Sequence, residues 1–192
     1  MTKKSFFLLK VFLICLASTN ISLADIQKDL INKLTATKTL SFDFKQQISD
    51  EEEIGNCFIK YPLLMKCIYK NSKQKTIISN GKTVAIIKKK YKKIYYYPIK
   101  STPLFFILKK ENIINLIRKN SPTNVSSALI EFEFIDEKKN TVKILFDKNS
   151  LEFKGWKTKD SYSNNVNFEI SNLKVNNQII DNFIKIPKEK DL

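Results

Sequence analysis

Two cysteines are the residues of this chain with the clearest chemical potential. Cys57 and Cys67 stand symmetrically about Tyr61-Pro62, where the proline fixes φ and interrupts a β-ladder. In the simplest hairpin about that pair the two cysteines lie directly opposite each other, at a Cβ separation that suits a disulfide. Disulfides persist in exported proteins, whereas two free thiols would act as small apolar side chains. The sequence leaves both states open.

Other groups suited to catalysis are scarce. The chain has no histidine, which excludes Cys–His nucleophilic pairs and the usual zinc ligand sets. It also lacks the Gly-x-Ser-x-Gly turn that presents a nucleophilic serine in α/β-hydrolases. The acidic run at 50–53 is more typical of an exposed turn than of a metal site. We therefore expect no enzyme activity, no cofactor and no metal.

The hairpin that carries the cysteines is expected to have one apolar face. Lys60 and Lys66 should face water, so residues of the opposite parity share the other face. That face carries Cys57, Ile59, Tyr61, Met65, Cys67 and Tyr69. It contains no pair of groups suited to proton transfer, which favours a concave sheet that holds an apolar ligand without chemistry.

The first 24 residues are predicted to be a secretory signal peptide. Two lysines open the chain, an apolar run follows from Ser5 to Ala17, and Ser22-Leu23-Ala24 supplies small residues at the cleavage positions. An uncleaved anchor helix is the alternative, but the run is shorter than a membrane requires. Residues 25–192 then form a single domain.

The chain is strongly basic, with 34 Lys and Arg against 19 Asp and Glu and a formal net charge of +15. Arg118 is the sole arginine. Lysine heads are well hydrated and usually lie on solvated faces, and an exported protein rarely meets nucleic acid, so no nucleic-acid partner is expected. A basic protein is nevertheless attracted to an anionic membrane surface.

Alternating segments predict an antiparallel meander, with a short amphipathic helix over 25–34 before it. The hydrophobic residues Leu40, Phe42 and Phe44 alternate with polar ones, and Asn80-Gly81 predicts a type I′ turn between two apolar runs. Gly155 suggests a bulge that re-aims Trp156. Further strands are expected over 94–97, 128–134, 141–146, 151–154, 165–170 and 183–186.

Two segments in the middle of the chain have particular compositions. Tyr95, Tyr96 and Tyr97 follow a basic loop at 88–93, and we expect a strand with two of these rings inside and one outside. A patch for a membrane interface or an acidic partner is the alternative. Thr102 and Pro103 then suit the start of a helix, which continues as the entirely apolar run 104–108 before a second helix over 111–118. Such a run needs cover on every side.

The order of these elements resembles the outer-membrane lipoprotein carrier (LolA) family over essentially the whole segment 25–192. The segments that carry the resemblance are Phe42-x-Phe44-x-Gln46, Tyr61-Pro62 with Met65 to Tyr69, Ser79 to Thr83, Thr102 to Leu108, Trp156-x-Thr158-x-Asp160, Asn172 to Asn176, and Phe183 to Pro187. The resemblance implies an α+β fold: an open antiparallel half-barrel of about 9–11 strands with a helical lid over its concave apolar face.

The resemblance also implies a function, namely a periplasmic carrier that receives lipoproteins from an inner-membrane ABC transporter and delivers their acyl chains to an outer-membrane receptor. We expect a monomer with a hollow too large for its own side chains to fill. The expected acyl-chain-binding residues are Phe42, Phe44, Ile59, Tyr61, Met65, Cys67, Tyr69, Leu104, Phe105 and Leu108. A related half-barrel that senses or transports lipid or lipoprotein in the periplasm is the alternative.

The sequence departs from the family at two of these positions. Tyr61 stands where the family commonly has an arginine that latches the lid, and a tyrosine offers one hydroxyl and no charge. Cys67 stands where an aromatic residue is expected, which enlarges the hollow or makes room for a disulfide. Both departures concern the energetics of opening.

Overall fold

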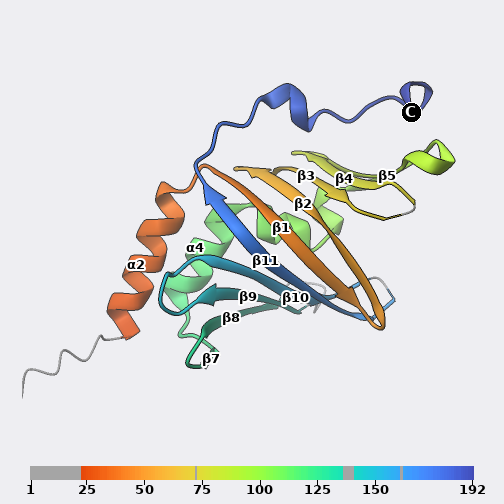
Figure 1. Cartoon of the computed structure of the whole chain (residues 1–192). Coiled ribbons are helices and arrows are strands. Elements are labelled where there is room, and N and C mark those ends of the chain that lie inside the picture. The colour runs from red at the N-terminus through yellow and green to blue at the C-terminus, as the bar shows by residue number, and fades with distance from the viewer. Residues whose placement is uncertain (1–22, 72, 136–140, 161) are drawn as a thin grey trace, which may run out of the picture.

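A single curved sheet dominates the fold of this chain (Figure 1). The computed structural model describes residues 23–71, 73–135, 141–160 and 162–192. Within them, eleven antiparallel strands lie in the order β6-β5-β4-β3-β2-β1-β11-β10-β9-β8-β7. The order shows that β1 pairs with β11, which joins the first and last parts of the domain. The sheet stays open between its edge strands β6 and β7, so the expected open half-barrel is confirmed.

The strands follow the predicted alternation closely. They are β1 (Thr39–Ile48), β2 (Glu51–Lys60), β3 (Leu64–Tyr69), β4 (Lys75–Asn80), β5 (Thr83–Lys88), β6 (Lys93–Pro98), β7 (Asn124–Val125), β8 (Leu129–Ile135), β9 (Thr141–Asp147), β10 (Phe153–Lys159) and β11 (Asn165–Val175). Along β1, Leu40, Phe42 and Phe44 are buried while their neighbours lie closer to solvent. Period-two hydrophobicity thus gives the sheet one apolar face.

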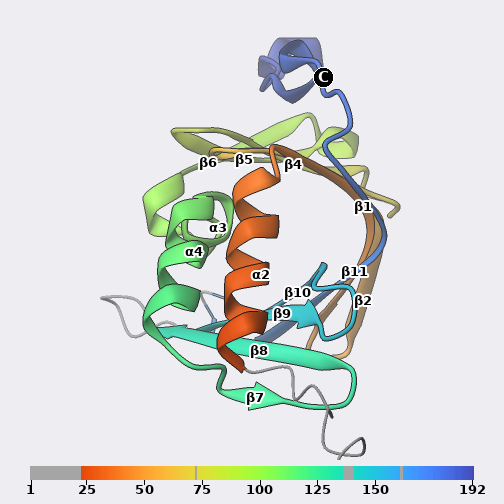
Figure 2. The same cartoon turned by 90° about the vertical axis from the view of Figure 1, so that its left-hand side faces the viewer.

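Helices of the described part of the chain cover the concave face of the sheet (Figure 2). They are α2 (Leu23–Ala36), α3 (Leu104–Leu108) and α4 (Lys110–Lys119). Helices α2 and α4 pack side by side, and the Gln27 side-chain amide donates hydrogen bonds to the carbonyl oxygens of Ile117 (3.0 Å) and Asn120 (2.7 Å). Among the described residues, no helix is long and apolar enough to span a membrane.

The C-terminal segment lies on the opposite, convex face of the sheet (Figures 1 and 2). After β11, Asn176 adopts a positive φ of 61° and the chain turns across β3 to β5. There Ile184 is buried against Ile78, Ala85 and Ile87, forming a second, smaller core. The strand expected over 183–186 is therefore wrong: η3 (Asp181–Ile184) is a 3₁₀ turn, because Ile184 is buried on the sheet surface rather than in a ladder.

The acidic run differs in part from its expected form. Glu51, Glu52 and Glu53 belong to β2 rather than to a turn, which is confined to residues 49–50. Lysines of β1 and β4 attract them, because Lys45 pairs with Glu52 at 2.8 Å and Lys75 pairs with Glu53. These ion pairs let the charged residues continue the ladder.

The Asn80-Gly81 hairpin exists, but its turn lies one residue later than predicted. Gly81 has a φ of +93° whereas Asn80 does not have a positive φ, which fits type II′ rather than type I′. The Asn80 Oδ1 accepts hydrogen bonds from the backbone amides of Lys82 (3.0 Å) and Thr83 (2.9 Å). The side chain of Asn80 thus stabilises the turn from outside its two central residues.

The bulge predicted at Gly155 is confirmed. The β9–β10 register shifts between Phe153 and Gly155, and Gly155 has a φ of +138°. A Cβ atom at this position would lie 1.9 Å from the Phe168 carbonyl oxygen. The bulge places the buried Trp156 ring against the Phe168 ring, with centroids 3.9 Å apart.

The three tyrosines of β6 contradict the expected strand with two rings inside. Tyr95, Tyr96 and Tyr97 are 42%, 54% and 44% exposed. The reason is their position, since β6 is an edge strand with a neighbouring strand on one side only. Sequence alternation predicted the strand correctly but not the cover on either face.

Candidate functional site

The apolar wall of the concave face is built from three adjacent strands. The register places Phe42 of β1 beside Cys57 of β2, and Cys57 beside Cys67 of β3. Every second residue along each of these strands faces the same side, which brings the remaining wall residues onto the concave face. The wall residues predicted from sequence that are buried here are Phe42, Phe44, Ile59, Met65, Cys67 and Tyr69.

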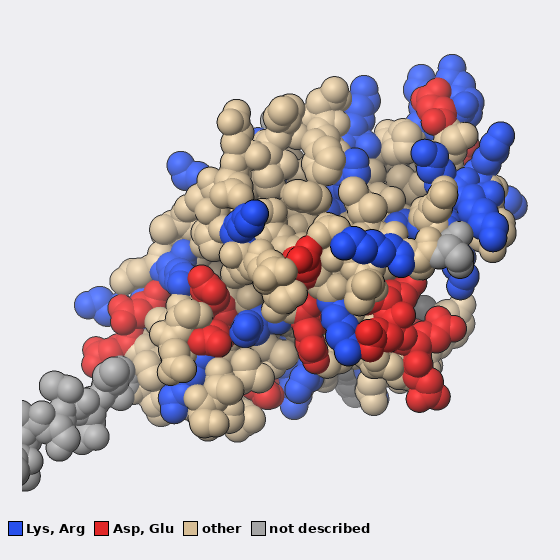
Figure 3. Space-filling view, in the orientation of Figure 1, with Lys and Arg blue, Asp and Glu red and all other residues tan. Residues whose placement is uncertain are grey.

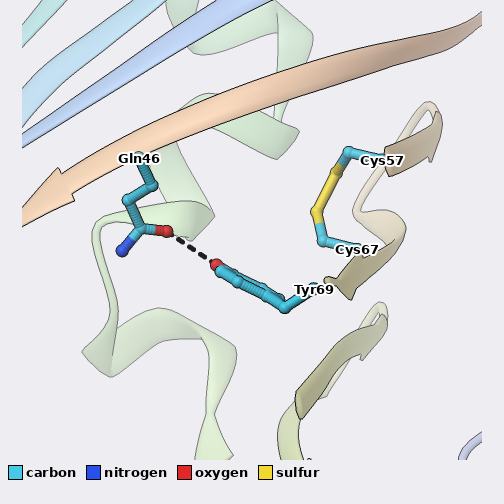
Figure 4. Close-up of a disulfide and its surroundings, with 4 residues drawn as sticks. All are labelled: Gln46, Cys57, Cys67 and Tyr69. Carbon is cyan, nitrogen blue, oxygen red and sulfur yellow. Dashed lines mark hydrogen bonds between the residues drawn. A yellow bond between two sulfur atoms is a disulfide. The ribbon is translucent and has the colours of Figure 1, made fainter. Parts of the chain in front are cut away.

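A disulfide crosses this wall (Figure 4). Cys57 and Cys67 occupy directly opposed positions on β2 and β3, and the structure has their sulfur atoms bonded. Both residues are buried. The bond therefore ties together the two strands that carry the centre of the wall, and it presents sulfur rather than an aromatic ring to the concave side.

One polar contact closes the end of the wall next to Tyr69. The Tyr69 hydroxyl donates a hydrogen bond to Gln46 Oε1 at 2.7 Å (Figure 4). Burial, and then the negative charge of Glu53, raise the pKa of Tyr69 above its ordinary value. The Lys75 ammonium lies 3.8 Å from the centroid of the Tyr69 ring and pairs with Glu53. The polar groups here are thus satisfied by one another.

The apolar run predicted for the lid forms α3, which lies beside α4 on the concave side (Figure 2). Leu108 is fully buried, as expected, whereas Leu104 and Phe105 are only partly buried against the core. Phe106 and Ile107 are buried at 6% and 0% exposure, and sequence reasoning did not select them. Five apolar residues in succession carry no helical phase, so the buried face of α3 could not be chosen from sequence.

The start of α3 also differs from its expected form. The Thr102 hydroxyl donates to the Ile99 carbonyl oxygen (2.8 Å) instead of accepting a hydrogen bond from the helix, and the helix begins at Leu104. The Phe106 ring stacks on the Phe134 ring of β8, with centroids 3.9 Å apart. This contact turns Phe106 toward the sheet and fixes the phase that the sequence left open.

Comparison with known families decides what this half-barrel is. The family described as outer membrane lipoprotein carrier protein LolA matches residues 35–186. The chain belongs to the LolA family. Comparison with the curated proteins finds no match.

Solved structures resemble this chain at low sequence identity. An uncharacterized conserved protein from Thermus thermophilus shares the fold, at 9% identity and a TM-score of 0.51, over 87% of this chain and 96% of that one. A LolA superfamily protein from Nitrosomonas europaea is 7% identical with a TM-score of 0.46, over 83% and 97%. The Pseudomonas aeruginosa MucA/MucB complex matches at 7% identity and a TM-score of 0.47, over 87% and 62%.

Side chains of α3 pack against the concave wall of this LolA-family chain. Ile59 and Met65 of the sheet share one continuous core with Ile107 and Leu108 of α3. Three surface hollows lie outside this core: beside the β3–β4 loop, between the C-terminal segment and β4 to β6, and on the convex face by Phe58. Where the sequence predicts a hollow too large for the chain's own side chains, α3 places the buried Ile107 and Leu108 against the wall in this structure.

The contacts that hold the lid differ from an arginine latch. Lys110, the first residue of α4, donates from Nζ to the carbonyl oxygens of Thr35 (3.1 Å) and Thr37 (2.7 Å) at the end of α2. The backbone amide of Leu63, in the β2–β3 turn, donates to the Leu108 carbonyl oxygen at 2.9 Å. The positive charge that holds the lid is thus the Lys110 ammonium, which lies on the lid itself. It binds the C-terminal carbonyls of α2, where a positive charge is favoured.

Tyr61 lies next to this contact without hydrogen-bonding to the lid through its hydroxyl. Within the described residues, the Tyr61 hydroxyl has no hydrogen bond, and the Lys110 ammonium lies 5.7 Å from the centroid of its ring. Burial, and then the charge of Glu111, raise the pKa of Tyr61 above its ordinary value. Tyr61 therefore contributes a neutral ring beneath Lys110, consistent with the departure noted from the sequence.

Proposed function

We propose that this LolA-family protein is a periplasmic carrier that binds the acyl chains of lipoproteins released from the inner membrane and delivers them to the outer membrane. The observation that supports it is the pairing of an apolar concave wall with a separate helical lid in a chain of this family. An inner-membrane ABC transporter would load the carrier and an outer-membrane receptor would unload it. Cleavage after Ala24 would free a monomeric domain into the periplasm.

Acyl chains would take the place of the lid side chains. The lid residues Phe106, Ile107 and Leu108 fill the concave side when the lid is down. When α3 moves away, an acyl chain can lie on the concave face of the sheet. It would contact the wall residues Phe42, Phe44, Ile59, Tyr61, Met65, Cys67 and Tyr69. The partly buried Leu104 and Phe105, together with Leu108, would then cover the chain from above.

This exchange explains how a carrier binds an apolar ligand and still releases it. One long acyl chain gains on the order of 10 kcal/mol on burial, at about 0.8 kcal/mol per methylene. Uncovering three large apolar side chains costs about 5–9 kcal/mol, at about 1.5–3 kcal/mol each. The two terms nearly offset each other, which leaves a modest net affinity. Release then needs only a receptor with a better pocket.

The site requires no chemistry from the chain. The polar groups beside Tyr69 are engaged with one another, as Tyr69 with Gln46 and Lys75 with Glu53 show. The proposed role is therefore binding rather than catalysis, with no metal and no cofactor.

A matched pair of variants tests this proposal. Phe105→Glu places a charge on the lid, whereas Phe183→Glu places the same charge on the C-terminal segment of the convex face, where Phe183 packs against Phe58. Spheroplasts with the transporter are incubated with each purified protein, and soluble complexes with newly made lipoproteins are measured. We expect Phe105→Glu to lose the complexes and Phe183→Glu to retain them. Equal transfer by Phe105→Glu, with the domain folded, would overturn the proposed site.

A further inference from the structure

The acidic and basic residues of the chain are unevenly distributed. Between Glu53 and Glu111 there are 14 lysines and no acidic residue. This stretch forms most of β2, the strands β3 to β6, and α3. Figure 3 shows lysines gathered around the end of this half of the sheet, while the acidic residues of the β1–β2 end lie together below. One edge of the sheet is therefore strongly basic.

Exposed tyrosines lie within this basic edge. Tyr91 of η1 (Lys89–Tyr91) is 52% exposed, like the three tyrosines of β6. We call the exposed residues of this edge the tyrosine–lysine edge; they are Lys89, Lys90, Tyr91, Lys92, Lys93, Tyr95, Tyr96 and Tyr97. The Lys88 ammonium lies 5.3 Å from the centroid of the Tyr95 ring, so lysine and tyrosine side chains are intermixed.

The tyrosine–lysine edge has the form of a ridge rather than a groove. Tyr97 pairs with Val84, whose side chain belongs to the concave core, while Tyr96 pairs with Ala85, which belongs to the convex core. Aromatic rings therefore project from both faces of one edge strand. A folded partner would have to supply a matching groove, whereas the interfacial layer of a bilayer accepts such a ridge without one.

Few acidic groups lie near the lysines of the ridge. Glu189 of the C-terminal segment accepts a hydrogen bond from the Ile94 amide (3.0 Å), and Glu53 pairs with Lys75. Asp191 is exposed on the same segment as Glu189. Among the described residues, none of the four ridge lysines forms an ion pair. The four lysines outnumber Glu189 and Asp191, so the ridge keeps a net positive charge toward an external anionic surface.

We propose that the tyrosine–lysine edge binds the surface of an anionic phospholipid bilayer. Tyrosine rings combine an apolar body with a polar tip and favour the interface between headgroups and acyl chains. Lysines close to an anionic surface add attraction that salt screens. This surface is separate from the site beneath the lid, so the two proposals stand or fall independently. Its role would be to hold the carrier at the membrane during exchange.

Flotation with lipid vesicles tests the proposal on the mature protein. We expect binding to phosphatidylcholine vesicles that contain about 30% phosphatidylglycerol, weak binding to phosphatidylcholine alone, and release by salt. Each lysine contributes about fivefold in affinity. The variant with Lys89, Lys90, Lys92 and Lys93 changed to Gln should therefore lose more than about a hundredfold.

A charge-matched control separates this edge from the overall charge of the protein. Changing Lys154, Lys157, Lys159 and Lys174 to Gln removes the same charge from exposed positions on β10 and β11. We expect this control to bind the anionic vesicles within a few-fold of the unchanged protein. An equal loss in both variants would show attraction by net charge alone and would overturn the proposal. So would the absence of binding to anionic vesicles.

The aromatic contribution has its own variant. Changing Tyr95, Tyr96 and Tyr97 to Ser should weaken vesicle binding at low and at high salt, because rings act through partition rather than charge. Unchanged vesicle binding by this variant would overturn the role of the rings. If the unchanged protein bound soluble polyglutamate, an acidic polypeptide, more tightly than anionic vesicles, the choice of a bilayer as the partner would be overturned. Acyl-probe binding should be the same in all these variants, which keeps this test separate from that of the lid site.

Discussion

Replacement of Lys110 by methionine tests how the lid is held. The Lys110 ammonium donates to two carbonyl oxygens at the end of α2, at 3.1 and 2.7 Å, and methionine keeps most of the length of the side chain without the donor. Hydrogen bonds from a charged donor contribute about 1.5–3 kcal/mol each when buried. Lys110 is only partly buried, so we take about 1–2 kcal/mol for the pair together.

A change of this size raises the population of the open lid about 5- to 30-fold. If acyl chains enter only when the lid is open, the apparent dissociation constant falls by the same factor. Titration of the Lys110→Met variant with a fluorescent long-chain fatty acid measures this directly. The reasoning is refuted if the folded variant binds the fatty acid as the unchanged protein does, or more weakly.

Lys109 provides the matched control for this experiment. It is the exposed neighbour of Lys110, and its ammonium lies 5.7 Å from the centroid of the Phe105 ring. Among the described residues, it forms no ion pair. Lys109→Met should therefore change the affinity for the fatty acid by less than about twofold. An equal gain in both variants would attribute the effect to charge rather than to the hold on α2.

Three further predictions concern the wall and its supports. The mature protein should show no free thiol, and loss of the Cys57–Cys67 bond, which spans 10 residues, should cost about 2–3 kcal/mol in a urea unfolding curve; two titratable thiols in the native protein would contradict it. Gly155→Ala should lower stability by at least about 2 kcal/mol and red-shift the emission of Trp156, because the bulge cannot hold a Cβ; unchanged emission and stability would count against that account. The pKa of Tyr69 is raised on folding, so its neutral hydroxyl contributes to the free energy of unfolding. That contribution is full below about pH 10 and is lost as the pH rises further. Tyr69→Phe should remove that alkaline loss, as followed by circular dichroism, and an identical pH profile in the variant would refute the assignment.

The strands of the wall could be predicted because their pattern is local. Leu40, Phe42 and Phe44 alternate with polar residues, and Pro62 fixes the middle of the hairpin that sets Cys57 opposite Cys67. Each of these inferences needs only period-two geometry and one turn. The sheet face of the site follows from them directly.

The remainder depends on contacts between residues far apart in the chain. The phase of α3 is fixed when Phe106 stacks on Phe134, and nothing near residues 104–108 in the sequence indicates it. Tyr95 to Tyr97 are exposed because β6 lies at the edge of the sheet, and Ile184 is buried because the C-terminal segment crosses the convex face. Segments of this kind satisfy the same local pattern in more than one environment.

The closed lid is the feature that the sequence was least able to indicate. An apolar wall and an apolar helix are compatible with an open hollow or with a filled one, and the choice depends on whether Ile107 and Leu108 reach the sheet. In this structure they do, and their burial gives the closed state its stability. Binding is therefore expected to compete with the packing of the lid.

The most direct test of the account is to locate a bound acyl chain. The mature protein is loaded with a photoreactive long-chain fatty acid, irradiated and digested, and the labelled peptides are mapped by mass spectrometry. We predict labels on the wall strands β1 to β3, near Phe42 and Met65, and on α3. Labels confined to the convex face by Phe58 and Ile184, or labelling of the wall that excess unlabelled fatty acid does not reduce, would contradict it.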